Sequence, residues 1–301
     1  MTRGKKGLVM AGVLTLATLS AEQVLAGAWT QAKGKFYSRL AYEQYSADEY
    51  FDEDGTTRSY SPADPRKRDF EYDEDLTSLY LEYGLLDKLT LVASLNYKEA
   101  EWRYKAGGTP RMPRDMVAKT SGPGDQELGV KYQLLTTETG VLSIQGMYKT
   151  PEGYDEDDKG SLEIQRGDGQ EDYDVRLLYG QSLYPMIPGY FNVEAGYRVR
   201  SQEPADEFKY VLEVGVDFTS RFYGRVKLDG SAALGNSDET VSSAAVHADP
   251  SGNEVSIGKL DMALGFKITD HFGLEAIYRP ELYGENTTKG YSMGLALSCS
   301  Y

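Results

Sequence analysis

The chain ends on the stretch GYSMGLALSCSY, residues 290–301, and the alternation of its side chains decides the fold. Every second residue is apolar or aromatic, and these residues share one face of an extended strand: Tyr291, Met293, Leu295, Leu297, Cys299 and Tyr301. The residues between them are small or polar: Ser292, Gly294, Ala296, Ser298 and Ser300. A strand with a lipid-facing side and a water-facing side, ending on an aromatic residue, is typical of the closing strand of a transmembrane β-barrel.

The N-terminus carries the features of an export signal. Three basic residues among the first six precede a short apolar run at 8–19, and the small residues at 24–26 suit a cleavage site. No cysteine follows the apolar run, which argues against a lipid anchor. No later segment approaches the roughly 18 uncharged apolar residues of a membrane helix. We therefore expect a signal peptide at 1–26 and a single barrel domain at 27–301.

The composition suits a barrel better than a soluble enzyme. Hydrophobic residues make up 40% of the 301 residues, because a barrel adds a polar lumen and loops to its lipid-facing side. The 24 tyrosines, against 9 phenylalanines, suit the aromatic girdles at the two membrane interfaces. The net charge of −15 becomes −17 without residues 1–26, which carry three cations and one anion. Nucleic acid is not an expected partner of so acidic a protein.

Period-two patterning predicts twelve strands. Their approximate ranges are 35–45, 76–84, 89–97, 126–135, 141–150, 172–183, 190–200, 208–218, 222–234, 257–268, 272–279 and 290–301. Twelve is an even number, so both termini of the barrel would lie on the periplasmic side. The prediction is an all-β fold, a transmembrane antiparallel β-barrel of about twelve strands.

The connections between these strands alternate in length. The short connections are 84–88, 136–140, 184–189, 219–221 and 269–271. The long ones are 46–75, 98–125, 151–171 and 235–256, with 201–207 and 280–289 as shorter members of the same set. Short periplasmic turns and long extracellular loops are the pattern of outer-membrane barrels. We therefore expect the protein in the outer membrane of a Gram-negative cell, in contact with outer-membrane lipid, lipopolysaccharide and the barrel-assembly machinery.

Charged residues occupy the face of the strands that the alternation assigns to the lumen. The inward cations are Arg39, Lys131, Arg176, Arg198, Arg200, Lys209, Arg225, Lys227, Lys259, Lys267 and Arg279. The inward anions are Glu43, Glu82, Glu127, Asp174, Glu194, Glu213, Asp217, Asp229, Asp261 and Glu275. This lumen is close to neutral, and so many inward charges require either water or mutual pairing.

The densest inward cationic stretch gives the candidate solute contacts. Arg198 and Arg200 on one strand, with Arg176 on the strand before it, could contact a carboxylate or phenolate solute, and Glu194 and Glu213 lie on the same side. The alternative is that these arginines brace the wall by pairing with Glu194, Glu213 and Asp174. Both interpretations are compatible with the sequence.

Residues for catalysis and metal binding are scarce. The chain has two histidines, His247 in a long loop and His271 in a short turn, so an enzyme with a histidine base is disfavoured. Acidic clusters in the long loops, such as 52–54, 73–75 and 155–158, lack the spacing of a dedicated calcium loop and are read as solvated loops, with weak divalent bridging to glycolipid as the alternative. We predict no catalytic residue, no metal site and no cofactor.

Four stretches resemble a bacterial outer-membrane family named for the MetA pathway of phenol degradation. They are Gly27-Ala-Trp29-Thr-Gln-Ala-Lys33-Gly34, Glu82-Tyr-Gly84-Leu-Leu-Asp87-Lys88-Leu89, Gly124-Asp-Gln-Glu127-Leu-Gly129-Val-Lys131-Tyr132, and Gly167-Asp-Gly169-Gln170 leading to Leu177-Leu-Tyr179-Gly180. The resemblance spans most of the chain after residue 26. It implies a porin-like barrel and the passage of aromatic compounds, and it brings no catalytic residue.

Two functions are consistent with these features. The first is a porin-like channel for the passive passage of small solutes, aromatic compounds among them. The second is a structural or interaction barrel, such as a sheath around an electron-transfer partner or a component of an envelope protein complex.

Overall fold

The computed structural model describes residues 27–59, 68–107, 113–151, 164, 166–167, 169–201, 204–237 and 254–301. The predicted signal peptide, His247 and the acidic cluster at 155–158 lie outside these residues. The strands are β1 (Phe36–Phe51), β2 (Thr57–Ser59), β3 (Arg68–Leu86), β4 (Leu89–Gly107), β5 (Pro113–Pro123), β6 (Asp125–Thr136), β7 (Gly140–Pro151), β8 (Asp172–Ser182), β9 (Gly189–Arg200), β10 (Glu207–Asp217), β11 (Phe222–Ala233), β12 (Ser256–Lys267), β13 (Phe272–Glu285) and β14 (Thr287–Ser300).

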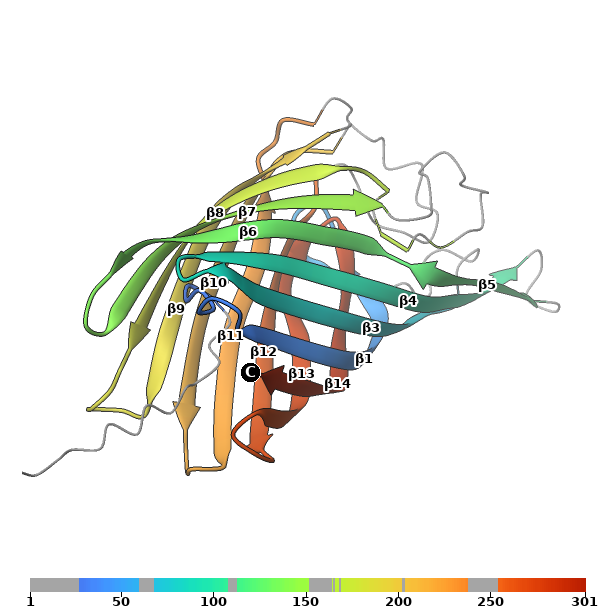
Figure 1. Ribbon diagram of the computed structural model, residues 1–301. Coiled ribbons are helices and arrows are strands. Elements are labelled where there is room, and N and C mark those ends of the chain that lie inside the picture. Colours follow the sequence, from blue (N-terminus) through green and yellow to red (C-terminus); the bar gives the residue numbers. More distant parts are fainter. Residues whose placement is uncertain are drawn as a thin grey trace, which may run out of the picture.

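Twelve of these strands form a closed antiparallel barrel (Figure 1). Neighbours in the sequence are neighbours in the sheet, and β14 pairs with β1 to close the ring. The two remaining strands lie off this ring, because β2 pairs only with β1 and β5 pairs with β4. Closure bonds the backbone of each strand to two neighbours, which a lipid environment demands. The twelve-strand prediction is confirmed.

The two faces of each strand differ as the sequence predicts. On β14, Tyr291, Met293, Leu295 and Leu297 are 43–57% exposed, whereas Ala296 between them is 2% exposed. Only small apolar clusters are buried inside, such as Ala41 with Ile277 and Ala296. Most large apolar side chains therefore face outward, and lipid rather than a protein core covers them.

The first and last strands meet in a seam at the periplasmic end. Phe36 and Tyr301 exchange two backbone hydrogen bonds of 3.0 Å, and their rings stack at 6.3 Å. His271 packs its ring 5.2 Å from that of Tyr301, and its Nδ1 lies 2.9 Å from the carbonyl oxygen of Ser300. His271 therefore contributes to closing the barrel.

Two of the predicted long loops, and the shorter connection at 280–289, are in large part strand. β13 runs to Glu285 and β14 begins at Thr287, so only Asn286 connects these two strands. The predicted loops at 46–75 and 98–125 are wrong because β1 and β4 continue to Phe51 and Gly107, and β3 starts at Arg68. The outward face of this extension is charged, and Arg103 on β4 bonds Asp73 on β3 at 2.8 Å. Outside the lipid the outward face needs no apolar residues, so the hydrophobic alternation stops while the strands continue.

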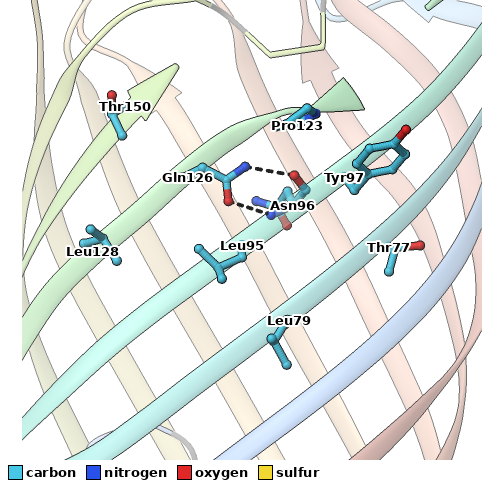
Figure 2. A pocket seen from close by; sticks show the side chains of 9 residues that line it. All are labelled: Thr77, Leu79, Leu95, Asn96, Tyr97, Pro123, Gln126, Leu128 and Thr150. Carbon is cyan, nitrogen blue, oxygen red and sulfur yellow. Dashed lines mark hydrogen bonds between the residues drawn. The ribbon is translucent and has the colours of Figure 1, made fainter. Parts of the chain in front are cut away.

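Gly124 alone separates β5 from β6, and a groove on the lipid-facing wall lies beside this break (Figure 2). The strand that pairs with β4 changes here. Ser94 on β4 pairs with Glu127 on β6, whereas Tyr97 on β4 pairs with Pro123 on β5. The Gln126 side chain supplies the hydrogen bonds that the backbone of a neighbouring strand would otherwise make to Asn96. Its Oε1 accepts from Asn96 N at 3.0 Å, and its Nε2 donates to Asn96 O at 2.8 Å. The groove beside it measures about 510 Å³ and has the following lining: Thr77, Leu79, Leu95, Asn96, Tyr97, Pro123, Gln126, Leu128 and Thr150.

The face assignment of β14 predicts a difference in thiol labelling. Cys299 lies on the lipid side of the last strand, so it should react poorly with a bulky membrane-impermeant maleimide in intact cells. The matched control is a Lys119→Cys variant that also carries Cys299→Ala. Lys119 lies on β5, which pairs with the extracellular end of β4, and its side chain is 69% exposed. We expect fast labelling of the control and little labelling of the native protein, and equal labelling would contradict the assignment.

Candidate functional site

The lumen is lined by ion pairs from end to end. Each of the eleven cations and ten anions predicted to face inward forms an ion pair with an N···O distance of 3.7 Å or less. The sequence reasoning missed seven further members of this set: Glu74, Lys98, Asp125, Lys149, Asp172, Glu207 and Glu281. Mutual pairing therefore satisfies the inward charges.

One ion-pair network crosses the wall from β10 to β1. Arg225 on β11 contacts Glu213 at 3.2 Å and Asp261 at 3.3 Å, and Arg279 contacts Asp261 at 2.7 Å. The network then passes over β14, because Arg279 reaches Glu43 on β1 at 3.1 Å. Small inward residues on β14 make this possible. A Cβ at Gly294 would lie 2.7 Å from the Cγ of Glu43, and Arg39 likewise bonds Glu275 at 2.9 Å.

The predicted arginine ladder lies in a second network, on β6 to β10. Arg198 contacts Glu127 at 2.6 Å and Asp174 at 3.3 Å, and its side chain is only 11% exposed. Arg176 bonds both carboxylate oxygens of Asp174 and lies 3.7 Å from Glu194.

Arg200, the third of these arginines, lies 3.7 Å from Asp172 and 3.5 Å from Glu207. The structure thus places all three arginines in cross-strand pairs, as the bracing interpretation expects. The expected pairing of the ladder with Glu213 is not formed. Glu213 instead accepts from Arg225 on β11 and from the Tyr190 hydroxyl on β9.

The most exposed luminal charges lie elsewhere, on β11 and β12. Asp229, Lys259 and Lys267 keep 43%, 39% and 31% of their side chains exposed, more than the other predicted inward charges. Lys227, next to Asp229 on the inner face, keeps 22%. Water in the lumen has its best access to protein charges along this wall.

A buried ion pair lies near the periplasmic end. Lys131 Nζ is 2.6 Å from Glu82 Oε1, and neither side chain is exposed. Glu82 also accepts from the Tyr80 hydroxyl at 2.6 Å and from the Gln31 amide at 2.8 Å. Lys131 donates a further bond of 2.7 Å to the carbonyl of Gly27. Every polar group of the pair therefore has a partner, which such burial requires.

The acidic cluster at 52–54 stabilises the turn that follows β1. Asp52 accepts from the backbone amides of Asp54 and Thr56 and from Arg58 Nε at 2.6 Å. This guanidinium holds the pKa of the Asp52 carboxyl below its ordinary value. Within the described residues, no three His, Cys, Asp or Glu side chains gather as metal ligands would. The described residues also contain no helix that is long and apolar enough to span a membrane.

Solved structures share this architecture. The outer-membrane channel COG4313 from Pseudomonas putida F1 superimposes with a TM-score of 0.67 at 15% identity, over 92% of this chain and 99% of that one. The porin NanC superimposes with a TM-score of 0.51 at 8% identity, over 87% and 98% of the two chains. No family model matches the chain, and no curated protein matches it. The comparisons show the fold, a porin-like outer-membrane β-barrel.

Proposed function

We propose that this protein is a passive channel for small solutes in the outer membrane. The observation that carries the proposal is a closed twelve-strand barrel whose inner wall is ionic and, along β11 and β12, exposed to solvent. Barrels of eight strands are filled by side chains and those of sixteen carry wide channels, so twelve strands suit a narrow one. The two superimposable proteins are described as an outer-membrane channel and a porin, which supports the same function here.

Small organic anions, including aromatic carboxylates and phenolates, are the solute class we propose. Lys227, Lys259 and Lys267 present their ammonium groups on the most solvent-exposed wall of the lumen. Each has a carboxylate neighbour, so the wall attracts an anion without holding it tightly. Weak binding at several sites is what conduction requires.

The charge balance of the lumen predicts the electrical behaviour. Cations and anions are nearly equal in number along the inner wall, so ion selectivity at neutral pH should be weak. The acidic residues of the extracellular extension should enrich cations at the mouth. This enrichment should shrink as salt shortens the screening length from ~10 Å at 0.1 M to ~3 Å at 1 M.

The experiment that tests the proposal is single-channel recording of the purified barrel in a planar bilayer. The native protein should conduct, and Arg198→Gln with Arg200→Gln should lower the unfolding temperature with little change in selectivity, since these arginines brace the wall. The matched control is Lys259→Gln with Lys267→Gln, which should shift selectivity toward cations at nearly unchanged stability. A large selectivity shift in the arginine variant would place the ladder on the solute path, and a native barrel that never conducts would contradict the channel.

A further inference from the structure

The groove on the lipid-facing wall spans the boundary between the hydrocarbon layer and the head groups. Strand pairing arranges the outward residues of β1, β3 and β4 in rows that follow one another toward the extracellular end. These rows are Leu40 with Leu79 and Leu95, then Tyr42 with Thr77 and Tyr97, then Gln44 with Asp75 and Glu99. Apolar, aromatic and charged rows in this order suit the hydrocarbon, the interface and the water beyond it. The groove takes part of its lining from each of the first two rows.

The floor of the groove is the break between β5 and β6. Gly124 N donates to Asn96 O at 3.0 Å, and Gln126 Nε2 donates to Gly124 O at 2.7 Å. Asn96 Nδ2 donates in turn to Asp125 O at 2.9 Å. Two side-chain amides thus bond the main chain where the strands separate, as a lipid-facing wall requires. Because these amides bind the backbone of the protein itself, recognition of a ligand falls to the rest of the lining.

The rest of the lining is mainly apolar. Leu79, Leu95 and Leu128 surround the break, and Pro123 and the Tyr97 ring border it on the extracellular side (Figure 2). The volume of about 510 Å³ falls within the ~300–1,000 Å³ of small-molecule sites. Leu95 and Leu128 remain 39% and 50% exposed, so the groove is open toward the surrounding membrane. Its shape and chemistry therefore suit a flexible hydrocarbon chain.

The groove is continuous with the part of the barrel that lipid covers. On its membrane side, the outward residues Leu91, Val130 and Tyr132 of β4 and β6 are 40–46% exposed. A lipid chain beside these residues reaches the groove without leaving the hydrocarbon layer. A water-soluble ligand would first have to pass the charged row and the head groups. The occupant that the position favours is a chain of the surrounding leaflet.

We propose that the groove binds one acyl chain of an outer-leaflet lipid, and that this chain seals the break between β5 and β6. The charges above the groove pair with one another, since Arg103 bonds Asp73 at 2.8 Å and Lys119 bonds Glu101 at 2.6 Å. The site therefore recognises the chain, and the head group contributes little. This inference is independent of the proposed channel function.

Photocrosslinking in vesicles tests the site. The probe is phosphatidylcholine with a diazirine on one acyl chain, and the readout is the yield of crosslinks at single residues. Leu128 in the groove should crosslink about threefold more than Leu264, because binding strength grows with the apolar area that is buried. Leu264 is the matched position, an outward leucine on β12 that is 68% exposed. Equal yields at the two leucines in the native protein would overturn the site.

Two tryptophan variants separate the groove from the general lipid surface. Leu95→Trp fills the groove and should lower the Leu128 yield to that of Leu264, whereas Leu264→Trp should leave the Leu128 yield unchanged. Thr150→Phe fills the groove from β7 and gives the same test if Leu95→Trp does not fold. A phosphatidylglycerol probe with the same chain should give the same yields. A yield that follows the head group instead of the chain would contradict recognition by the groove.

Thermal unfolding tests the seal. The barrel held without lipid in an amphipathic polymer should unfold at a lower temperature than the same barrel after phosphatidylcholine is added. Leu95→Trp should unfold at one temperature with and without lipid, because the indole replaces the chain. Leu264→Trp should keep the lipid dependence of the native protein. Equal stabilisation of both variants by lipid would show a general effect of the membrane and would overturn the seal.

Discussion

Replacing Lys131 by methionine is expected to lower the stability of the barrel by about 3–5 kcal/mol, the cost of leaving one partner of a buried ion pair without the other. Glu82 would keep its bonds from Tyr80 and Gln31 but lose the cation 2.6 Å away, in a site with no exposed surface. Gly27 would also lose the donor to its carbonyl. The measurement is the temperature at which the barrel loses its compact form in detergent, followed by heat-dependent electrophoretic mobility.

The control is the same substitution at a partly exposed pair. Lys227 lies 2.9 Å from Asp229, but the two side chains are 22% and 43% exposed. Lys227→Met should therefore cost no more than about 1 kcal/mol. Adding Glu82→Gln to Lys131→Met should recover part of the loss, because the unpaired charge disappears. Equal losses at the two lysines would show that burial does not control the strength of these pairs.

Changing Tyr301 to aspartate, or deleting it, should reduce the yield of folded protein in the outer membrane severalfold. Tyr301 supplies both backbone bonds of the last rung between β14 and β1, and its ring contacts Phe36 and His271. An aspartate at this position would bring a charge to the lipid-facing side of the closing strand, where charges are disfavoured. The measurement is the amount of heat-modifiable barrel in outer-membrane fractions.

Tyr301→Phe is the matched control, because it keeps the ring and the backbone bonds and removes only the hydroxyl. Its yield should equal that of the native protein. A normal yield of the aspartate variant would show that the seam closes without an apolar terminal residue. We propose that the same C-terminal strand is what the barrel-assembly machinery engages, which the yield measurement also reports.

The sequence predicted which face of each membrane-spanning strand points inward. All twenty-one charged residues that it assigned to the lumen form ion pairs there. This succeeded because lipid imposes a strict period of two on every strand that crosses it. It failed at the extracellular ends of β3 and β4, where charged residues replace the apolar ones and strand and loop look alike. Lys98 and Glu74 were missed as luminal charges for this reason, since they lie in the extension.

The interior was harder to predict because pairing partners depend on which strands are neighbours. Arg198 and Glu127 lie 71 positions apart in sequence and meet only through the registers of β6 to β9. Residues 27–32 resemble part of an outer-membrane family, but no pattern in the sequence predicts their hydrogen bonds to the inner wall of β4, β6 and β7. The signal that could have found them is the inward glycine at position 84 or 180, which becomes meaningful only once the wall around it is known.

The uneven height of the wall also determines how deeply the barrel can settle in the membrane. On β3 and β4, outward-facing acids and arginine begin just beyond Tyr97, which is 45% exposed, and continue through Asp73 and Arg103. If the barrel moved deeper into the membrane by the length of two strand residues, these charges on β3 and β4 would enter the hydrocarbon layer. The charged extension therefore limits how deeply this flank of the barrel can enter the membrane.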